Sequence, residues 1–304
     1  MSVLVLAEHD VRRLLPMSEC IEAMEEVLRS LARGGLHQPL RPMTRAPDGQ
    51  SLMGLMPAHR GGERPAWSLK EIVVVPDNPT RGLDAHQGAV LLHDGRTGEL
   101  RALLNASAIT EIRTAAVSAV AMRALARRDA RVVAILGGGV QARSHGEAMR
   151  AVLPDAELRT WARSDGGTPE HVLREADVVC TCTSAHEPIL RREWLGPGAH
   201  VNAVGASIPS ARELDSDTVV AATLFVDRRE SALNEAGDLL LAGVGADGIA
   251  AELGEVLIEA HPGRCAAEEL TVFKSLGLAV EDLAAASLCV ERARERGVGT
   301  EVPF

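Results

Sequence analysis

Short hydrophobic runs, rich in β-branched residues, recur through the middle of the chain and alternate with amphipathic stretches of helical length. Strands buried on both faces have this character, and regular alternation of strand and helix is typical of a parallel sheet with right-handed crossovers. The pattern therefore predicts an α/β domain. Its expected strands are residues 132–136, 158–161, 178–181, 200–204 and 223–226.

The first 112 residues follow another pattern. Residues 11–31 have helical periodicity, and after them short strand-like runs such as 71–75 alternate with turns. One glycine-containing turn, 94–98, lies between the runs 89–93 and 100–104, as in a β-hairpin. We expect a mostly antiparallel sheet in this part of the chain.

Near the C-terminus, an Ala/Leu-rich helix is expected at 280–296, followed by a short tail. We expect this segment to return to the first domain. A chain of 304 residues is long enough for two domains. The sequence thus predicts a Rossmann-type domain at 114–286 and a second, α+β domain at 1–113, joined by 287–304.

The expected strand 132–136 leads into a G-x-G-x-x-A pattern formed by Gly137, Gly139 and Ala142, at the start of a predicted helix, 140–152. Such glycines permit a tight turn and let the backbone approach a pyrophosphate, which the helix N-terminus attracts. A lone glycine triplet also occurs in ordinary strand-to-helix turns. The flanking strand and helix favour dinucleotide binding here.

Few residues separate the expected strands that end at 161 and begin at 178, and Gly166, Gly167 and Pro169 interrupt them. A full Rossmann half would place a helix, a strand and a second helix there. We therefore expect a trimmed unit with one short helix at 169–175.

Arg163 and Ser164 follow the second expected strand, where many dinucleotide folds have an acidic residue that binds the ribose 2′-hydroxyl. An arginine and a hydroxyl suit a 2′-phosphate, so the sequence favours NADP(H), with NAD(H) as the alternative. Asp165 is a feature against this choice. A solvated surface arginine is the competing interpretation.

Three cations, Arg45, Lys70 and Arg113, interrupt their local patterns. Lys70 lies within a strand-like run, where an unpaired ammonium is costly to bury. Each cation alone is consistent with a structural ion pair. Together they suit recognition of a small carboxylate, since a guanidinium binds it through two parallel hydrogen bonds.

Asp227 ends the expected strand 223–226. The carboxyl ends of parallel strands line the ligand crevice, so a carboxylate there could move protons or hold an ammonium or iminium group. The alternative is a helix N-cap for the following segment.

Composition excludes several classes. The net charge of −10 argues against nucleic-acid binding, and the chain has no apolar run long enough to cross a bilayer. Its five cysteines are scattered without metal-ligand spacing. We expect a cytoplasmic protein with no nucleic-acid partner, no membrane association and no metal.

Several segments, in order, resemble the ornithine cyclodeaminase/mu-crystallin family, and residues 251–256 and 273–277 are most similar to its mu-crystallin-like ketimine reductase branch. The resemblance implies a Rossmann domain, and a homodimer formed through the sheet of the other domain. The other segments that carry it are 113–119, 137–145, 187–207 and 235–240.

The resemblance also implies site residues. Arg45, Lys70 and Arg113 match positions that hold the substrate carboxylate, and Asp227 matches a catalytic aspartate. The implied catalytic residues are therefore Lys70, Asp227 and Arg113. The implied cofactor-binding set is His86, Arg113, Gly137, Gly139, Val140, Gln141, Ala142, Arg163, Ser164, Thr183, Val204 and Ser275.

Two departures from the family pattern concern the cofactor: Ala162 stands where an amide is expected, and Ala85 where a hydroxyl is expected. The implied activity is an NAD(P)H-dependent reduction of small imino acids, or the reverse amino-acid dehydrogenation. One alternative is an amino-acid cyclodeaminase with tightly bound NAD, and another is a ligand-binding protein without turnover.

Overall fold

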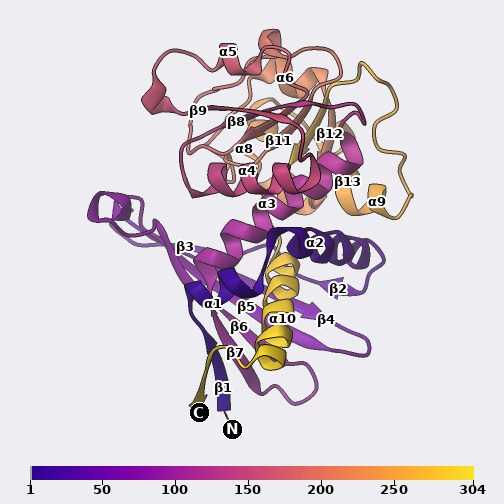
Figure 1. Ribbon diagram of the computed structural model, residues 1–304. Coiled ribbons are helices and arrows are strands. Elements are labelled where there is room, and N and C mark those ends of the chain that lie inside the picture. Colours follow the sequence, from indigo (N-terminus) through magenta and orange to yellow (C-terminus); the bar gives the residue numbers. More distant parts are fainter. Residues whose placement is uncertain (1) are drawn as a thin grey trace. The chain divides into compact units, whose positions relative to one another are not determined.

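The computed structural model describes residues 2–304 and divides them into two compact units (Figure 1). The first contains the residues up to Arg113 together with Leu278–Phe304, and the second is Thr114–Gly277. The C-terminal part of the first unit begins at Leu278, earlier than the expected 287. The reason is that helix α10 (Ala279–Arg296) packs on the first unit's sheet and on α2.

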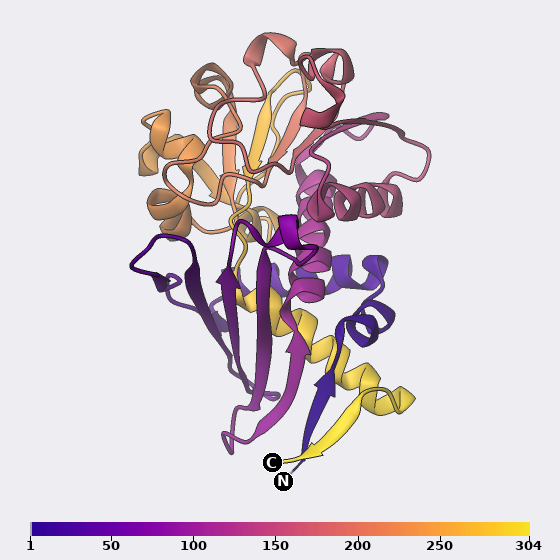
Figure 2. The same cartoon turned by 90° about the vertical axis from the view of Figure 1, so that its left-hand side faces the viewer.

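Within residues 2–304, the first unit has an eight-stranded sheet in which only β1 and β7 pair in parallel. This confirms a mostly antiparallel sheet. Figure 2 shows the two terminal strands side by side, a pairing that local sequence patterns do not reveal. The order is β15 (Thr300–Pro303), β1 (Ser2–Leu6), β7 (Leu100–Asn105), β6 (His86–Asp94), β5 (Ala66–Val74), β4 (Leu52–Arg60) and β2 (Leu36–His37), with β3 (Met43–Arg45) on β4.

Helices α1 (Glu8–Leu14) and α2 (Met17–Ala32) replace the single helix expected at 11–31. Pro16 separates them, because it has no N–H group and disfavours helical backbone in the residue before it. It becomes the N-cap of α2 instead. Helix α3 (Ala106–Leu125) follows β7 directly, and the Asn105 side chain accepts a hydrogen bond from the Ala108 amide in its first turn. A short 3-10 helix, η1 (Asn78–Arg81), precedes β6.

The second unit contains a parallel sheet of seven strands within the described chain, which confirms the α/β prediction. Two of its strands were not expected from the sequence: β13, and β14 in the middle of the sheet. Both are four residues long and include a charged residue, so neither forms a purely apolar run. The order is β13 (Ile249–Glu252), β12 (Thr223–Val226), β14 (Thr271–Lys274), β11 (His200–Ala203), β10 (Val178–Thr181), β8 (Val132–Leu136) and β9 (Glu157–Trp161).

The connection between β9 and β10 is short. It contains a 3-10 turn, η2 (Arg163–Asp165), and a single four-residue helix, α5 (Glu170–Leu173), which confirms the short helix expected there. The remaining elements of this unit are α4 (Val140–Val152), η3 (Arg192–Trp194), α6 (Ser216–Ala221), α7 (Arg229–Glu235), α8 (Gly237–Leu241), η4 (Ala246–Gly248) and α9 (Leu253–Leu257). Across residues 2–304, no helix has the length and apolar character needed to cross a membrane.

Candidate functional site

The strand order of the second unit is of the kind that forms a ligand crevice in open α/β sheets. β9 lies on one side of β8 and β10 on the other, so the chain reverses direction across the sheet at β8. In open α/β sheets, ligands bind at the carboxyl ends of the strands at such a switch point. The site should therefore lie beyond Leu136, where the glycine pattern begins.

The glycine turn after β8 fits a pyrophosphate. A Cβ at Gly137, whose φ is +141°, would lie 2.7 Å from the Cys182 carbonyl oxygen. A Cβ at Gly139 would meet nothing within 4 Å. Gly139 is the N-cap of α4 and provides no side-chain hydrogen bond to the first amides of this helix, the groups that bind a phosphate at a helix N-terminus.

Arg163 and Ser164, the residues implied to bind a 2′-phosphate, are exposed in η2, at the end of β9. Asp165 is turned back on this segment: its Oδ2 accepts from the Ala162 amide at 2.8 Å and its Oδ1 from the Ser164 hydroxyl at 3.4 Å. The Arg163 guanidinium makes no hydrogen bond or ion pair with the described residues. The Arg163 guanidinium is therefore available to a ligand, whereas the Asp165 carboxylate accepts hydrogen bonds within its own turn.

Three other implied cofactor residues lie at the carboxyl ends of neighbouring strands. Thr183 follows β10, Val204 follows β11 and Ser275 follows β14. The Val204 amide donates to the Thr181 carbonyl at 3.1 Å, and the Ser275 amide donates to the Ala203 carbonyl at 3.0 Å. The sheet thus brings these positions to one edge.

Sequence reasoning missed a buried ionic network at this same edge. Glu213, Asp238 and Lys274 are each fully buried, and the Lys274 Nζ lies 3.1 Å from Asp238 Oδ2. Burial raises the pKa of Glu213, while the charge of Lys274 and hydrogen bonds from Thr181 and Thr183 oppose that shift. Asp238 and Lys274 lie in segments that carry the family resemblance, but those segments alone do not show that the two side chains meet.

Asp227 is buried at the end of β12. Its Oδ1 accepts from the Arg228 amide at 2.8 Å, and its Oδ2 accepts from the Leu276 and Gly277 amides at 2.6 and 2.8 Å. It does not cap α7, whose N-cap is Arg228, so the helix-cap alternative is wrong. Asp227 instead ties the end of β12 to the loop after β14.

In the first unit, Lys70 and Arg113 meet over one carboxylate. The Lys70 Nζ lies 2.9 Å from Asp282 Oδ2, and the Arg113 Nε lies 3.0 Å from Asp282 Oδ1. Arg113 Nη1 also donates to Glu281 at 2.7 Å. These side chains are at most 4% exposed, so the cluster is a desolvated arrangement of two cations and two carboxylates.

The cluster changes how readily Lys70 holds its proton. Burial lowers the pKa of Lys70 to about 8, although the Asp282 charge acts in the opposite direction. Lys70 comes from β5, Arg113 from α3, and Glu281 and Asp282 from the first turn of α10. The two acidic residues were not assigned a role from the sequence. The available signal was a pair of adjacent acids ahead of an apolar stretch, Leu283–Ala286.

The strand register places Arg45 and His86 on the same sheet face as Lys70. Arg45 pairs with Leu52, Leu52 with Val74, and Val74 with His86, and cross-strand partners share a face. Lys70 is four residues before Val74 on β5, so its side chain points to the same side. Arg45 is exposed and is not part of the buried cluster.

His86 also reaches solvent at the start of β6. The surrounding protein atoms and the charge of Lys70 lower the pKa of His86. The imidazole is therefore held toward its neutral form, which can accept as well as donate a hydrogen bond.

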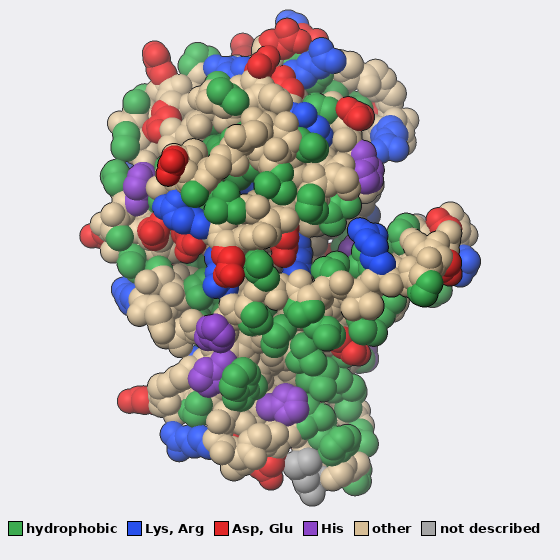
Figure 3. Space-filling model, turned by 180° about the vertical axis from the view of Figure 1, so that it is seen from behind, with side chains coloured by type: hydrophobic (Ala, Val, Ile, Leu, Met, Phe, Trp, Pro, Cys, Tyr) green, Lys and Arg blue, Asp and Glu red, His purple; other side chains and the backbone are tan. Residues whose placement is uncertain are grey.

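The opposite face of this sheet is apolar and open. Met53 and Trp67 are 41% and 47% exposed, and the His59 and Trp67 rings lie 4.4 Å apart between centroids. Figure 3 shows hydrophobic side chains gathered over this part of the molecule, with histidines among them. Exposed hydrophobic side chains gathered on one face are typical of an interaction surface.

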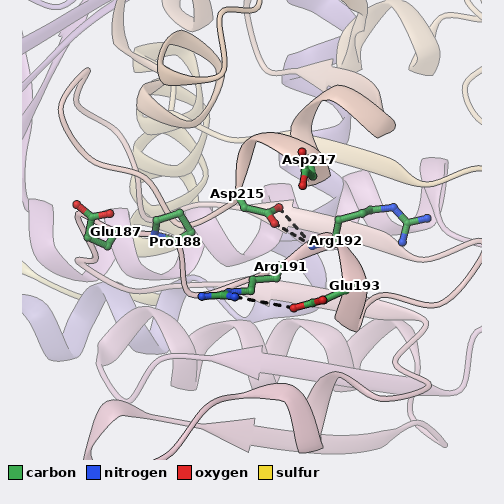
Figure 4. A pocket seen from close by; sticks show the side chains of 7 residues that line it. All are labelled: Glu187, Pro188, Arg191, Arg192, Glu193, Asp215 and Asp217. Carbon is green, nitrogen blue, oxygen red and sulfur yellow. Dashed lines mark hydrogen bonds and ion pairs between the residues drawn. The ribbon is translucent and has the colours of Figure 1, made fainter.

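A separate pocket lies between η3 and the start of α6 (Figure 4). Asp215 accepts from the Arg192 amide at 3.2 Å and caps α6 through the Thr218 amide, and Arg191 approaches Glu193. This pocket contains none of the implied site residues. The lining residues are Glu187, Pro188, Arg191, Arg192, Glu193, Asp215 and Asp217. Among residues 2–304, no group of His, Cys, Asp or Glu side chains is arranged to hold a metal ion.

The chain is similar to known proteins over most of its length. The family model of the ornithine cyclodeaminase/mu-crystallin family matches residues 1–172 and 164–297. Ketimine reductase mu-crystallin of Mus musculus is 41% identical over 301 residues, covering 93% of this chain and 94% of the relative. Delta(1)-pyrroline-2-carboxylate reductase of Bacillus cereus is 36% identical, covering 99% of this chain and all of the relative.

Solved structures agree with this fold. Thermococcus litoralis Delta(1)-pyrroline-2-carboxylate reductase, in complex with NADH and L-proline, has a TM-score of 0.90 and 33% identity, covering 99% of this chain and all of that chain. An archaeal alanine dehydrogenase dimer with bound NAD has a TM-score of 0.93 and 30% identity, with full coverage of both chains. A lysine cyclodeaminase has a TM-score of 0.90 and 30% identity, covering this chain fully and 96% of its own.

Proposed function

The chain belongs to the ornithine cyclodeaminase/mu-crystallin family, and on that premise we propose that it is an NAD(P)H-dependent reductase of small imino acids. Its substrates would be ketimine carboxylates, and the reverse reaction would be dehydrogenation of an amino acid. The observation that carries this proposal is the buried pair of cations, Lys70 and Arg113, held in fixed positions by Asp282. Such preoriented cations suit a small anionic substrate.

In this proposal the second unit holds the dinucleotide. The amides at the N-terminus of α4 would bind the pyrophosphate above Gly137 and Gly139, with Val140, Gln141 and Ala142 in the first helical turn. The nicotinamide half of the dinucleotide would contact Thr183, Val204 and Ser275. When bound, the dihydronicotinamide supplies the hydride.

We further propose NADP(H) as the preferred form. The support is Arg163, exposed at the end of β9 beside Ser164, together with the engagement of Asp165 by the Ala162 amide. A guanidinium pairs well with a 2′-phosphate, whereas a free carboxylate would repel it.

The first unit provides the proposed substrate-binding residues. Lys70 and Arg113 would orient the substrate carboxylate, and the exposed Arg45 on the same sheet face would add a third cation. His86 would contribute a neutral hydrogen-bonding group. From the family resemblance we also assign to Asp227 the stabilisation of a protonated iminium group, the more electrophilic form of the substrate.

A second copy of the chain is the proposed partner. The sheet face that contains Met53 and Trp67 would be buried in a homodimer, since large hydrophobic side chains are costly to leave in water. The dimeric archaeal alanine dehydrogenase among the similar structures supports this assignment.

A cyclodeaminase is the second candidate. The lysine cyclodeaminase similar to this chain over its whole length favours it, and the same residue types would serve both reactions. The two differ in their products: a reductase changes the nucleotide's redox state, whereas a cyclodeaminase releases ammonia without net nucleotide change. A ligand-binding protein without turnover is the remaining alternative.

The decisive experiment follows nicotinamide absorbance with NADPH and, separately, NADH. The panel contains cyclic ketimine carboxylates such as Delta(1)-pyrroline-2-carboxylate, and 2-oxo acids with an amine. We expect turnover with the cyclic imino acids, and its loss in Arg113→Ala. Arg101→Ala, which removes an exposed arginine from the same unit, is the matched control. Ammonia release from diamino acids with no absorbance change would instead establish the cyclodeaminase.

A further inference from the structure

The buried carboxylate of Glu213 connects two strand ends of the second unit. Its Oε1 accepts from both the amide and the hydroxyl of Thr183 at 2.7 Å. Its Oε2 accepts from the Thr181 hydroxyl and the Gly205 amide, each also at 2.7 Å. One side chain therefore holds the end of β10 and the end of β11 together.

The backbone around Glu213 is itself held by the ion pair beneath it. Asp238 Oδ1 accepts from the Glu213 and Leu214 amides at 2.7 and 2.9 Å, while its Oδ2 lies 3.1 Å from Lys274 on β14. All three ionic side chains are 0% exposed. Breaking a hydrogen bond of this buried network is costly, because it leaves a polar group without a partner where water cannot reach.

Two glycines adapt the fold to this network. A Cβ at Gly205 would lie 2.0 Å from the Thr183 carbonyl oxygen and 2.6 Å from the Glu213 carboxylate. A Cβ at Gly237 would lie 1.9 Å from the Ala211 carbonyl oxygen. Any larger residue would displace the segments that the carboxylate holds.

The direction of the hydrogen bonds determines what Thr183 presents to the crevice. Each oxygen of the Glu213 carboxylate accepts from a backbone amide, and the Thr183 hydroxyl donates its proton to Oε1. One lone pair of that hydroxyl accepts from the Ala185 amide at 3.2 Å. The remaining lone pair is available to a ligand donor, such as a ribose hydroxyl, and Thr183 is half-buried rather than sealed.

We propose that Glu213, braced by Asp238 and Lys274, is a positioning residue for the nicotinamide half of the dinucleotide. It fixes the Thr183 hydroxyl as an acceptor and holds the Gly205 backbone beside it. This inference rests on the proposed dinucleotide binding. β10 and β11 lie on the opposite side of β8 from β9, so this half of the crevice is distinct from the half that would take the adenosine.

The test uses Glu213→Gln in the full chain. The substitution keeps the side-chain volume but replaces one carboxylate oxygen with an NH2 group. That group then faces a backbone N–H, either of Thr183 or of Gly205, and two donors cannot form a hydrogen bond. We measure dissociation constants for NADPH, NADH and ADP by fluorescence or calorimetry. We expect dinucleotide binding to weaken about 10-fold, the size of one lost buried hydrogen bond, with ADP binding unchanged.

The matched control is Asp177→Asn, at the opposite edge of the same sheet. Asp177 accepts from the Arg131 and Val132 amides at 2.7 and 3.0 Å and pairs with Arg127, so it is also a brace between segments. We expect this variant to lower the melting temperature without changing dinucleotide affinity. A parallel loss of ADP and dinucleotide binding in Glu213→Gln would overturn the proposal, as would wild-type dinucleotide affinity.

A second pair of variants keeps the test valid if Glu213→Gln does not fold. Thr183→Val should weaken dinucleotide binding about 10-fold and leave ADP binding unchanged, while Thr183→Ser should restore wild-type affinity. A dinucleotide affinity of Thr183→Val equal to that of the wild type would overturn the role of Glu213. Absence of NADPH and NADH binding in the wild type is a separate result, because it overturns the proposed function and this inference with it.

Discussion

Lys70 and Asp282 form a buried ion pair, with 2.9 Å between Nζ and Oδ2, although they are far apart in the sequence. The same carboxylate accepts from the Arg113 Nε, so one acidic residue positions both cations of the proposed carboxylate site. The pair also explains how a lysine is tolerated inside a strand: its charge is balanced where water cannot reach.

The ion pair predicts a pH limit on activity. Lys70 must be protonated to attract a substrate carboxylate, and its pKa of about 8 means that it loses the proton as pH rises through that value. We expect kcat/KM to be high below pH about 8 and to fall above it. A profile that stays flat to pH about 10 would contradict this role for Lys70.

Removing the shared carboxylate should affect both the site and the fold. In Asp282→Asn, the charge that supports protonation of Lys70 is lost, so the alkaline limb of the kcat/KM profile should move to lower pH. Because Lys70 and Arg113 lose a buried counter-ion, we expect a loss of about 3 kcal/mol in unfolding free energy by denaturant titration. An unshifted profile would show that Asp282 does not act on Lys70.

Arg163→Ala should separate the two nucleotides. We expect KM for NADPH to rise about 10-fold or more while KM for NADH stays near its wild-type value, because only NADPH carries the 2′-phosphate. Arg159→Ala is the matched control, since Arg159 lies on β9, just before the turn that contains Arg163, but donates to Glu157 and the Arg174 carbonyl. Equal effects on both nucleotides would contradict the proposed preference.

The two glycines of the turn should respond differently to alanine. Gly137→Ala places a Cβ against the Cys182 carbonyl at a positive φ, so it should lower both the melting temperature and the yield of folded protein. Gly139→Ala meets open space at a φ of −88°, so the fold should be unchanged. Its dinucleotide affinity should nevertheless fall about 10-fold, because the methyl group occupies the approach of the pyrophosphate. Unchanged affinity would place the pyrophosphate elsewhere.

The apolar sheet face predicts the oligomeric state. Trp67→Glu places a charge in the proposed interface, and we expect sedimentation to change from dimer to monomer. Val220→Glu alters another exposed hydrophobic residue, 71% exposed on α6, and should leave the dimer intact. A wild-type protein that sediments as a monomer would refute the proposed interface.

Local sequence alone determined the glycine turn after β8. The strand 132–136 and the helix 140–152 were expected with the boundaries that β8 and α4 have in the structure. Each depends on neighbouring residues: a β-branched run, glycines that permit the turn, and helical periodicity after it. The short helix between β9 and β10 was predicted for the same reason.

Tertiary structure decided which charged groups meet. The sequence indicated that Lys70 needs a partner, but only the packing of α10 on the sheet identified Asp282, and only the parallel order of β10, β11 and β14 brought Glu213 to Thr183 and Gly205. The sequence did not predict the pairing of β1 with β15 or the central place of β14, for the same physical reason. Such contacts join segments distant along the chain, and their free energy appears only when the fold has excluded water from both.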